Sequence, residues 1–109
     1  MVKALSPQQA QQLIELGEVE VIDVRDPHEW TGGHLAGARL VPLSELRANP
    51  RAAIQQDGVV FVCAAGIRSE TAARIATSLG FTRVYNLTGG TRAWERAGFA
   101  LVNELSVAV

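Results

Sequence analysis

The sequence VVFVCAAGIRS, residues 59–69, joins an entirely apolar segment to the start of a helical pattern. The apolar segment 59–62 predicts a strand that is buried on both faces, as in a mostly parallel sheet. From Ser69 to Leu79, apolar residues recur at helical spacing, and Gly80 ends the pattern. A buried strand followed at once by a long helix is typical of an α/β domain, in which the sheet lies between helices.

The same alternation of strand and helix patterns continues on both sides of this segment. Ser6 and Gln9 have the spacing of a capping box, which predicts a helix that ends at Gly17. The other elements that we expect are strands over 19–24, 39–41 and 83–87, short helices from Asp26 and from Ser44 to Leu46, a loop with a helical fragment over 47–57, a helix over 91–97, and a last strand or edge at 101–102.

Length and composition favour one small globular domain. The chain has 109 residues, of which 48% are hydrophobic, enough to fill a core. We therefore expect a single domain over residues 1–109, with 103–109 as a loose tail. The 10 basic and 11 acidic residues nearly cancel and form no basic block, which argues against binding to nucleic acid or to an acidic membrane surface.

The sequence indicates a cytoplasmic protein without a metal or an organic cofactor. We find no signal peptide at the N-terminus, and no apolar run approaches the roughly 18–20 residues of a membrane span. One cysteine, Cys63, cannot form an internal disulfide, and with two histidines in the chain it cannot build a cysteine-rich zinc site.

The loop after the apolar strand carries the candidate chemistry. Cys63 lies where the strand ends, which is where open α/β sheets place their sites. Backbone N–H groups of such a loop can form an anion nest, and the following helix adds its positive N-terminal dipole. A thiol there has a lowered pKa and reacts as a thiolate. Gly66 permits an unusual backbone conformation, and Ala64 and Ala65 keep the rim small. The alternative interpretation is a cysteine that only packs in the core.

Further motifs resemble, in order and in spacing, those of the rhodanese family, over nearly the whole chain. These motifs are Val21-Ile22-Asp23-Val24-Arg25, Glu29-Trp30, Gly33-His34-Leu35-Ala36-Gly37-Ala38, Pro42, Cys63-Ala64-Ala65-Gly66-Ile67-Arg68-Ser69, and Leu87-Thr88-Gly89-Gly90 followed by Trp94.

The resemblance implies a three-layer, rhodanese-like α/β domain with a mostly parallel central sheet flanked by helices. It also implies sulfur transfer: Cys63 takes sulfane sulfur from a donor, either thiosulfate or a persulfide, and passes it to a thiophilic acceptor such as cyanide or a thiol. The persulfide-binding loop would be formed by Ala64, Ala65, Gly66, Ile67, Arg68 and Ser69. The donor can be a small molecule or a protein, and the sequence does not indicate an oligomeric state.

Two other functions are compatible with the same fold. The first is a cysteine-dependent phosphatase or arsenate reductase. The spacing from Cys63 to Arg68 is C-x4-R, whereas the related phosphatases have the longer C-x5-R loop, and the chain has no second thiol for reductive cycling. The second is a non-catalytic binding or regulatory module, which the retained Cys63 and its intact loop argue against.

Several polar residues are expected to support this loop. We expect Asp23 either to brace the Cys63 loop, by accepting from loop N–H groups or from an arginine, or only to form a turn. We expect Arg25 to pair with Glu29 or another nearby acid. For Arg68 we favour a bracing role through a carboxylate over binding of an anionic donor.

The remaining motif residues are expected to be structural. We place His34 in a turn and not in the role of a general base, Trp30 and Trp94 in packing, and Gly89-Gly90 in a tight turn between strand and helix. Leu40 stands where the family commonly has asparagine. The loop carries no cation before Arg68, so a persulfide is at least as plausible a donor as thiosulfate.

Overall fold

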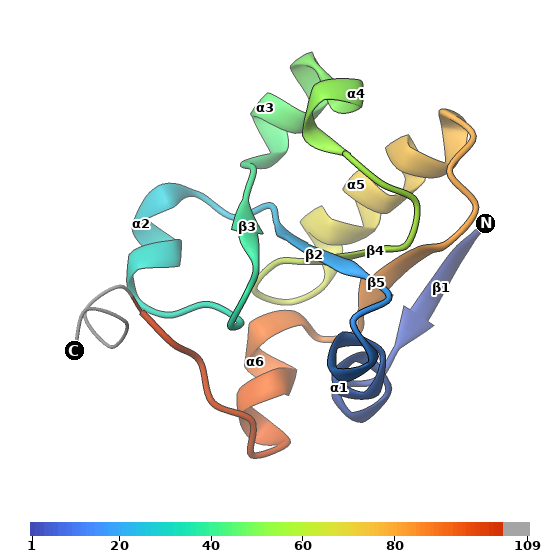
Figure 1. The fold of residues 1–109 in the computed structure, drawn as a ribbon. Coiled ribbons are helices and arrows are strands. Elements are labelled where there is room, and N and C mark those ends of the chain that lie inside the picture. The colour runs from blue at the N-terminus through green and yellow to red at the C-terminus, as the bar shows by residue number, and fades with distance from the viewer. Residues whose placement is uncertain (104–109) are drawn as a thin grey trace.

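The protein forms one five-stranded parallel sheet between two layers of helices (Figure 1). This computed structural model describes residues 1–103, so most of the predicted tail, 104–109, lies outside the described residues. The strand order is β1-β5-β4-β2-β3, with β1 at Val2–Leu5, β2 at Glu20–Asp23, β3 at Arg39–Leu40, β4 at Val59–Val62 and β5 at Val84–Leu87. The helices are α1 (Pro7–Leu16), α2 (Pro27–Thr31), α3 (Leu43–Ala48), α4 (Pro50–Ala53), α5 (Ile67–Ser78) and α6 (Gly90–Arg96). The predicted α/β class is confirmed.

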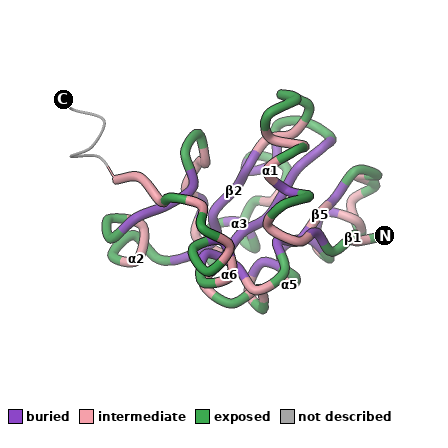
Figure 2. The backbone as a smooth tube through the Cα atoms, turned by 90° about the horizontal axis from the view of Figure 1, so that it is seen from below, coloured by how far each residue is buried: buried purple, intermediate pink, exposed green. Residues whose placement is uncertain are grey.

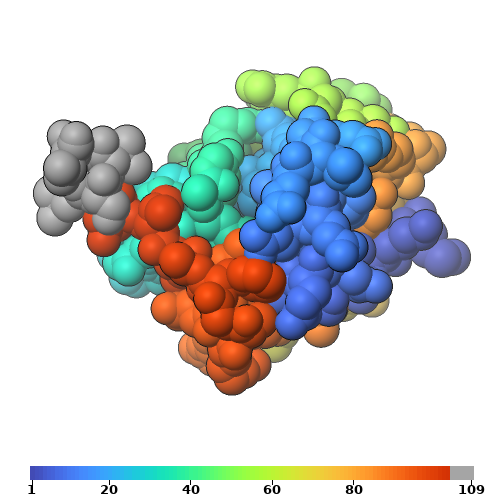
Figure 3. All heavy atoms as spheres, turned by 60° about the horizontal axis from the view of Figure 1, so that its bottom comes forward, coloured from blue at the N-terminus to red at the C-terminus, as the bar shows by residue number. Residues whose placement is uncertain are grey.

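The sheet separates two hydrophobic cores, and all four residues of its central strand β4 are buried. Buried backbone also runs through the labelled strands β2 and β5 in Figure 2. Phe61 faces the layer of α3, α4 and α5, where it packs with Leu46, Ala53, Ala72 and Ala76. Val60 and Val62 face the other layer, where α1 and α6 lie side by side (Figure 3), and pack with Ala10 and Trp94. Since β4 is covered on both faces, its C-terminal end, and with it Cys63, has a fixed position.

Local signals place the helix ends. In α1 the Ser6 hydroxyl accepts the N–H of Gln9 at 3.1 Å, and the Gln9 side chain accepts the N–H of Ser6 at 2.9 Å, so the predicted capping box is formed. The helix ends at Gly17, whose φ of 72° is in the left-handed region. The long helix α5 begins at Ile67, two residues before the predicted start, with Gly66 as its N-cap. Ser69 therefore lies in the first turn, where the N–H groups have no partner within the helix.

Several elements differ from the sequence-based expectation. The strand β1 was not expected: Val2–Leu5 is short and half exposed, and it exists because it pairs with β5 at the sheet edge. The helix α3 begins directly after Pro42, and the exposed Ser44 does not cap it. Residues 101–102 do not add a strand to the sheet: Val102 forms one isolated antiparallel bridge with His34.

The N-terminus of α6 is docked on the loop that follows β4. The N–H of Thr91 donates to the carbonyl of Cys63 at 2.8 Å, and the N–H of Arg92 donates to the carbonyl of Ala64 at 3.2 Å. Gly90 makes this approach possible, because a Cβ atom there would overlap the Cys63 carbonyl oxygen and lie 2.5 Å from that of Ala64. Its φ of 63° also favours glycine.

We expect Gly90→Ala to destabilise the fold far more than Gly17→Ala, which is a matched control. Gly17 has a similar φ of 72° but nothing within 4 Å of an added Cβ atom, so its replacement costs only the left-handed backbone, about 1 kcal/mol. At Gly90 the steric overlap adds to that cost, for a total of about 3 kcal/mol. Urea denaturation of the two variants measures the difference. Equal losses of stability would contradict a tight contact between α6 and the loop.

Candidate active site

The sulfur of Cys63 lies at the bottom of a cup of hydrogen-bond donors. Its Sγ atom accepts the N–H of Gly66 at 3.1 Å and that of Ser69 at 3.4 Å, and the Ser69 hydroxyl oxygen lies 3.3 Å away. The residue is only 1% exposed, yet the amides of the loop point toward the sulfur. Cys63 is therefore not a cysteine that only packs among apolar groups.

The backbone of the loop explains this orientation. The carbonyls of Cys63 and Ala64 point away toward α6, which they bind through its first N–H groups. Gly66 then turns the chain with a φ of 96° and packs against the β5–α6 turn, where an added Cβ atom would lie 3.1 Å from the nitrogen of Gly89. The N–H groups of Gly66 and Ser69 face the sulfur, as in an anion nest.

The surroundings of Cys63 act on its pKa in opposite directions. Burial raises the pKa of the thiol, because a charge is less stable away from water. Hydrogen bonds from the Ser69 hydroxyl and from the N–H groups of Ser69, Ala65 and Gly66 lower it by stabilising the thiolate. The lowering effects prevail, so the pKa of Cys63 is below that of an ordinary cysteine.

Not all of the predicted loop residues contact the sulfur. The side chain of Ile67 points outward and is 78% exposed. Ala64 contributes through its carbonyl, which fastens the loop to α6. Arg68 turns away to α2, where its guanidinium donates two hydrogen bonds to the carboxylate of Glu29 at 2.8 and 3.0 Å.

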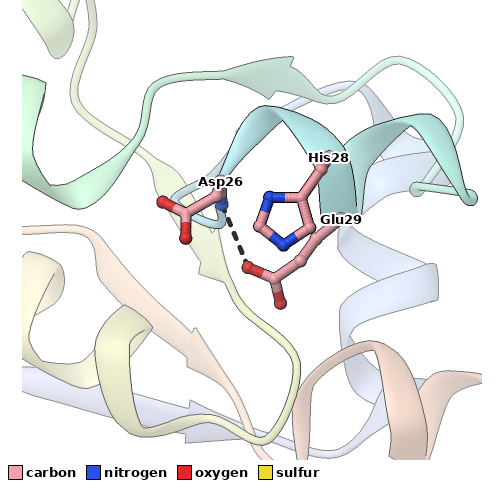
Figure 4. A group of neighbouring side chains, drawn as sticks. All are labelled: Asp26, His28 and Glu29. Atoms are coloured by element: carbon pink, nitrogen blue, oxygen red, sulfur yellow. Dashed lines mark hydrogen bonds between the residues drawn. The ribbon is translucent and has the colours of Figure 1, made fainter.

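The Arg68–Glu29 pair joins the first turn of α5 to α2. The hydrogen bond from Arg68 lowers the pKa of Glu29 to about 2, against the smaller effect of burial, and the pKa of Arg68 is raised in turn. One Glu29 oxygen also accepts the N–H of Asp26 at 3.1 Å, at the start of α2 (Figure 4). The structure therefore gives Arg68 a carboxylate partner, as in the bracing role that we favoured.

Asp26, His28 and Glu29 bring ligand-type atoms within 4.8 Å of one another. Figure 4 shows the three side chains gathered around the first turn of α2. Both Glu29 oxygens already accept from Arg68, and the positive guanidinium opposes a second cation at the same carboxylate. This cluster therefore gives no support for a metal site.

Asp23 and Arg25 form a buried ion pair with each other. The guanidinium of Arg25 reaches the Asp23 oxygens at 2.8 and 3.0 Å and donates a further bond to the carbonyl of Gly33 at 2.7 Å. Asp23 thus accepts from an arginine, as one of our alternatives had it. Its Oδ1 atom also accepts the backbone N–H of Arg25 at 3.0 Å, which is the turn of the other alternative. The acid that Arg25 pairs with is Asp23 and not Glu29. The pair ties the end of β2, where Asp23 lies opposite Val62 of β4, to the segment around Gly33.

Asn86 of β5 completes the surroundings of the sulfur, and the sequence analysis did not identify it. Its side-chain carbonyl accepts the Ser69 hydroxyl at 2.6 Å, and its side-chain NH2 donates to the carbonyl of Gly66 at 3.0 Å. A polar residue within a buried strand next to the central strand was the available signal, because buried amides require partners.

The remaining motif residues have structural contacts. The ring of His34 stacks on Trp30 at 3.5 Å between centroids, and its Nδ1 atom lies 3.1 Å from the Trp30 carbonyl oxygen. Trp94 is buried and donates from Nε1 to the carbonyl of Ala100 at 3.1 Å. The geometry gives His34 no part in the cup around the sulfur.

Among the described residues, no helix is both long and apolar enough to cross a membrane. The family model for the rhodanese-like domain matches residues 6–97. The chain is 38% identical over 93 residues to a thiosulfate sulfurtransferase, GlpE, of Pseudomonas fluorescens, which covers 85% of this chain and 84% of the relative. It is also 39% identical over 77 residues to an uncharacterized protein, YqhL, of Bacillus subtilis. That match covers 71% of this chain and spans 61% of the relative, less than two thirds of its length.

Solved structures show the same fold. A rhodanese-related protein of Thermoplasma volcanium superposes with a TM-score of 0.84 at 27% identity, over 94% of this chain and 99% of the other. A protein of unknown function from Rhodopseudomonas palustris, described as a possible tyrosine phosphatase, superposes with a TM-score of 0.82 at 30% identity, over 93% and 85% of the two chains. With the family match over most of the chain, these similarities show that the protein belongs to the rhodanese-like domain family.

Proposed function

We propose that the protein is a sulfurtransferase that carries sulfane sulfur as a persulfide of Cys63. The observation that carries the proposal is the cup of donors at the sulfur: two backbone N–H groups within 3.4 Å and a serine hydroxyl at 3.3 Å. The two N–H groups are fixed by the backbone, so they stabilise a negative charge without having to reorganise when the charge develops. A thiolate, or the anion of a persulfide, suits such a cup.

Two displacement steps make up the reaction. In the first, the Cys63 thiolate attacks the sulfane sulfur of the donor, a new S–S bond forms, and the donor's own S–S bond breaks. The electron pair of that bond leaves on sulfite when the donor is thiosulfate, and on a thiolate when the donor is a persulfide. In the second, the acceptor attacks the outer sulfur and Cys63 leaves as a thiolate. Because the chain has one cysteine, the acceptor must come from outside: cyanide becomes thiocyanate, and a thiol becomes a persulfide.

The charge around the cup bears on the choice of donor. Arg68 is the cation of the loop, and it donates hydrogen bonds to both carboxylate oxygens of Glu29. The exposed residue Ile67 at the rim is apolar. A doubly charged donor such as thiosulfate therefore gains little from Arg68. A protein or small-molecule persulfide fits this rim at least as well.

The loop length separates this proposal from phosphatase activity. The ring from Cys63 to Arg68 has one residue fewer than the loop of the related phosphatases. Moreover, Arg68 points to Glu29, whereas phosphate recognition favours an arginine whose fork is free for bidentate contact.

We expect intact-mass analysis to show a gain of one sulfur, about 32 Da, after incubation with thiosulfate or a persulfide donor. Cys63→Ala should show no gain and should lose transfer to cyanide. A phosphoester substrate tested in parallel should not be hydrolysed. Sulfur transfer by Cys63→Ala would contradict the proposal, and Cys63-dependent release of phosphate would favour a phosphatase instead.

The alkylation rate of Cys63 should level off at a lower pH than that of an ordinary cysteine, whose midpoint is about 8.5. Below its pKa the thiol is protonated and unreactive, so a lowered pKa moves the rise in rate toward acid. Iodoacetamide alkylation followed by mass spectrometry gives the profile. The same cysteine in the urea-unfolded chain is the control, and a folded midpoint at or above the unfolded one would contradict an activated thiolate.

We expect Glu29→Gln to lower the free energy of unfolding at pH 7 by about 1 kcal/mol, a small value because Arg68 is partly exposed to solvent. The pKa of Glu29 is lowered on folding from 4.5 to about 2. The stabilisation is therefore complete above pH 4.5 and is lost as the pH falls toward 2. Urea denaturation of both proteins between pH 2 and pH 7 tests this expectation. A difference between them that stays constant over this range would mean that the ion pair is not its source.

A further inference from the structure

The Ser69 hydroxyl has one hydrogen and two neighbours that can accept it. The side-chain oxygen of Asn86 lies 2.6 Å from the hydroxyl oxygen, and the sulfur of Cys63 lies 3.3 Å from it. The orientation of the Asn86 amide follows from its other contact, 3.0 Å to the carbonyl oxygen of Gly66. That carbonyl can only accept, so the amide NH2 must face it and the amide oxygen must face Ser69.

When Cys63 is a neutral thiol, the hydrogen bonds among Cys63, Ser69 and Asn86 all run in one direction, from the thiol toward the amide. Ser69 donates its hydrogen to Asn86, at the shorter of the two distances. A lone pair of the Ser69 oxygen then faces the sulfur, and the S–H group of Cys63 can donate to it. Each buried group has a partner in this state, so the arrangement stabilises the protonated form of Cys63.

When Cys63 is a thiolate, these hydrogen bonds must change. The sulfur then has no hydrogen and is the strongest acceptor near Ser69, because hydrogen bonds to a charged group are stronger than neutral ones. If the hydroxyl rotates toward the sulfur, the Asn86 oxygen loses its donor. Ser69 is 0% exposed and Asn86 is 7% exposed, so water has little access to replace it.

We propose that Asn86 is a positioning residue that competes with the Cys63 thiolate for the hydrogen of Ser69, so that ionisation of the thiol is coupled to rotation of this hydroxyl. The inference deepens the proposed function and rests on Cys63 as its nucleophile. The hydroxyl turns to the sulfur whenever Cys63 carries the charge, which is before it attacks the donor and again when it leaves from the persulfide. In the persulfide the inner sulfur is bonded and the charge is on the outer one, so the hydroxyl returns to Asn86.

Substitution of Asn86 removes no contact of the charged groups near Cys63. Arg68 on α5 is held by Glu29 of α2, Asp23 and Arg25 at the end of β2 neutralise each other, and Arg92 lies on α6 beside Ala64. Among the described residues, the hydrogen bonds of the Asn86 side chain go to Ser69 and Gly66 and to none of these charged groups. A change in thiol ionisation after substitution of Asn86 therefore reports on the Ser69 hydroxyl and on the loop.

The test is a double-mutant cycle on the pH profile of Cys63 alkylation. Asn86→Leu removes the competing acceptor at similar side-chain volume, and we expect the midpoint to fall by about one pH unit. Ser69→Ala removes the donor, and we expect the midpoint to rise. In the Ser69→Ala background, Asn86→Leu should no longer lower the midpoint. Any change in the midpoint that Asn86→Leu still causes in the Ser69→Ala background measures the loss of the hydrogen bond to the Gly66 carbonyl, which supports the loop.

The inference is overturned if Asn86→Leu leaves the midpoint unchanged or raises it, or if the fall is as large without the Ser69 hydroxyl. Circular dichroism confirms folding. If Asn86→Leu does not fold, Asn86→Ala supplies the same comparison, because it also removes the amide and adds no bulk. The alkylation profile requires no sulfur donor. If the protein gains no sulfur but the double-mutant cycle shows the expected coupling, only the sulfurtransferase proposal is rejected. If the mass gain is normal but the effects of the two substitutions are additive, only this inference is rejected.

Discussion

The site depends on two hydrogen bonds between backbone groups: those from Thr91 and Arg92 at the start of α6 to the carbonyls of Cys63 and Ala64. A peptide unit has its N–H and C=O groups on opposite sides, so carbonyls turned toward α6 at 63 and 64 turn the N–H groups of 64 and 65 the other way, and the Ala65 N–H is one of the donors that lower the pKa of Cys63. Gly90 allows the two backbones to meet. The cup around the sulfur thus depends both on how a neighbouring helix is packed and on the turn at Gly66, after which α5 begins.

Four of the charged side chains near this cup form two neutral pairs. Arg25 is paired with Asp23 in the interior, and Arg68 is paired with Glu29 at its edge. The groups left facing the sulfur are neutral donors, namely N–H groups and one hydroxyl. Neutral donors lower the energy of an anion without holding it as firmly as a full positive charge does. That balance suits an atom that must act in turn as nucleophile, as carrier and as leaving group.

Much of this arrangement could be predicted from the sequence. The apolar residues 59–62, the helical spacing after Ser69 and the capping box at Ser6 each have a local physical cause, and each element was found where it was expected, with α5 beginning two residues earlier. The edge strand β1 has no such cause, since it is stable only because β5 lies beside it. The partners of Asp23 and Arg68 also depend on contacts between distant parts of the chain. Spacing identified the residues that carry charge but left their pairing open.

Asn86 shows the same limit at the site itself. In the sequence it is one polar residue in a strand, and its role exists only because β5 lies beside the turn at Gly66 and the first turn of α5. Two neutral hydrogen bonds fix the direction of its amide, and the direction of the amide fixes where the Ser69 hydrogen points in the resting state. A residue that never touches the sulfur can therefore oppose the helix terminus and the backbone donors that favour the thiolate. The reactivity of Cys63 follows from the difference between these two influences, so the buried amide belongs to the site as much as the loop does.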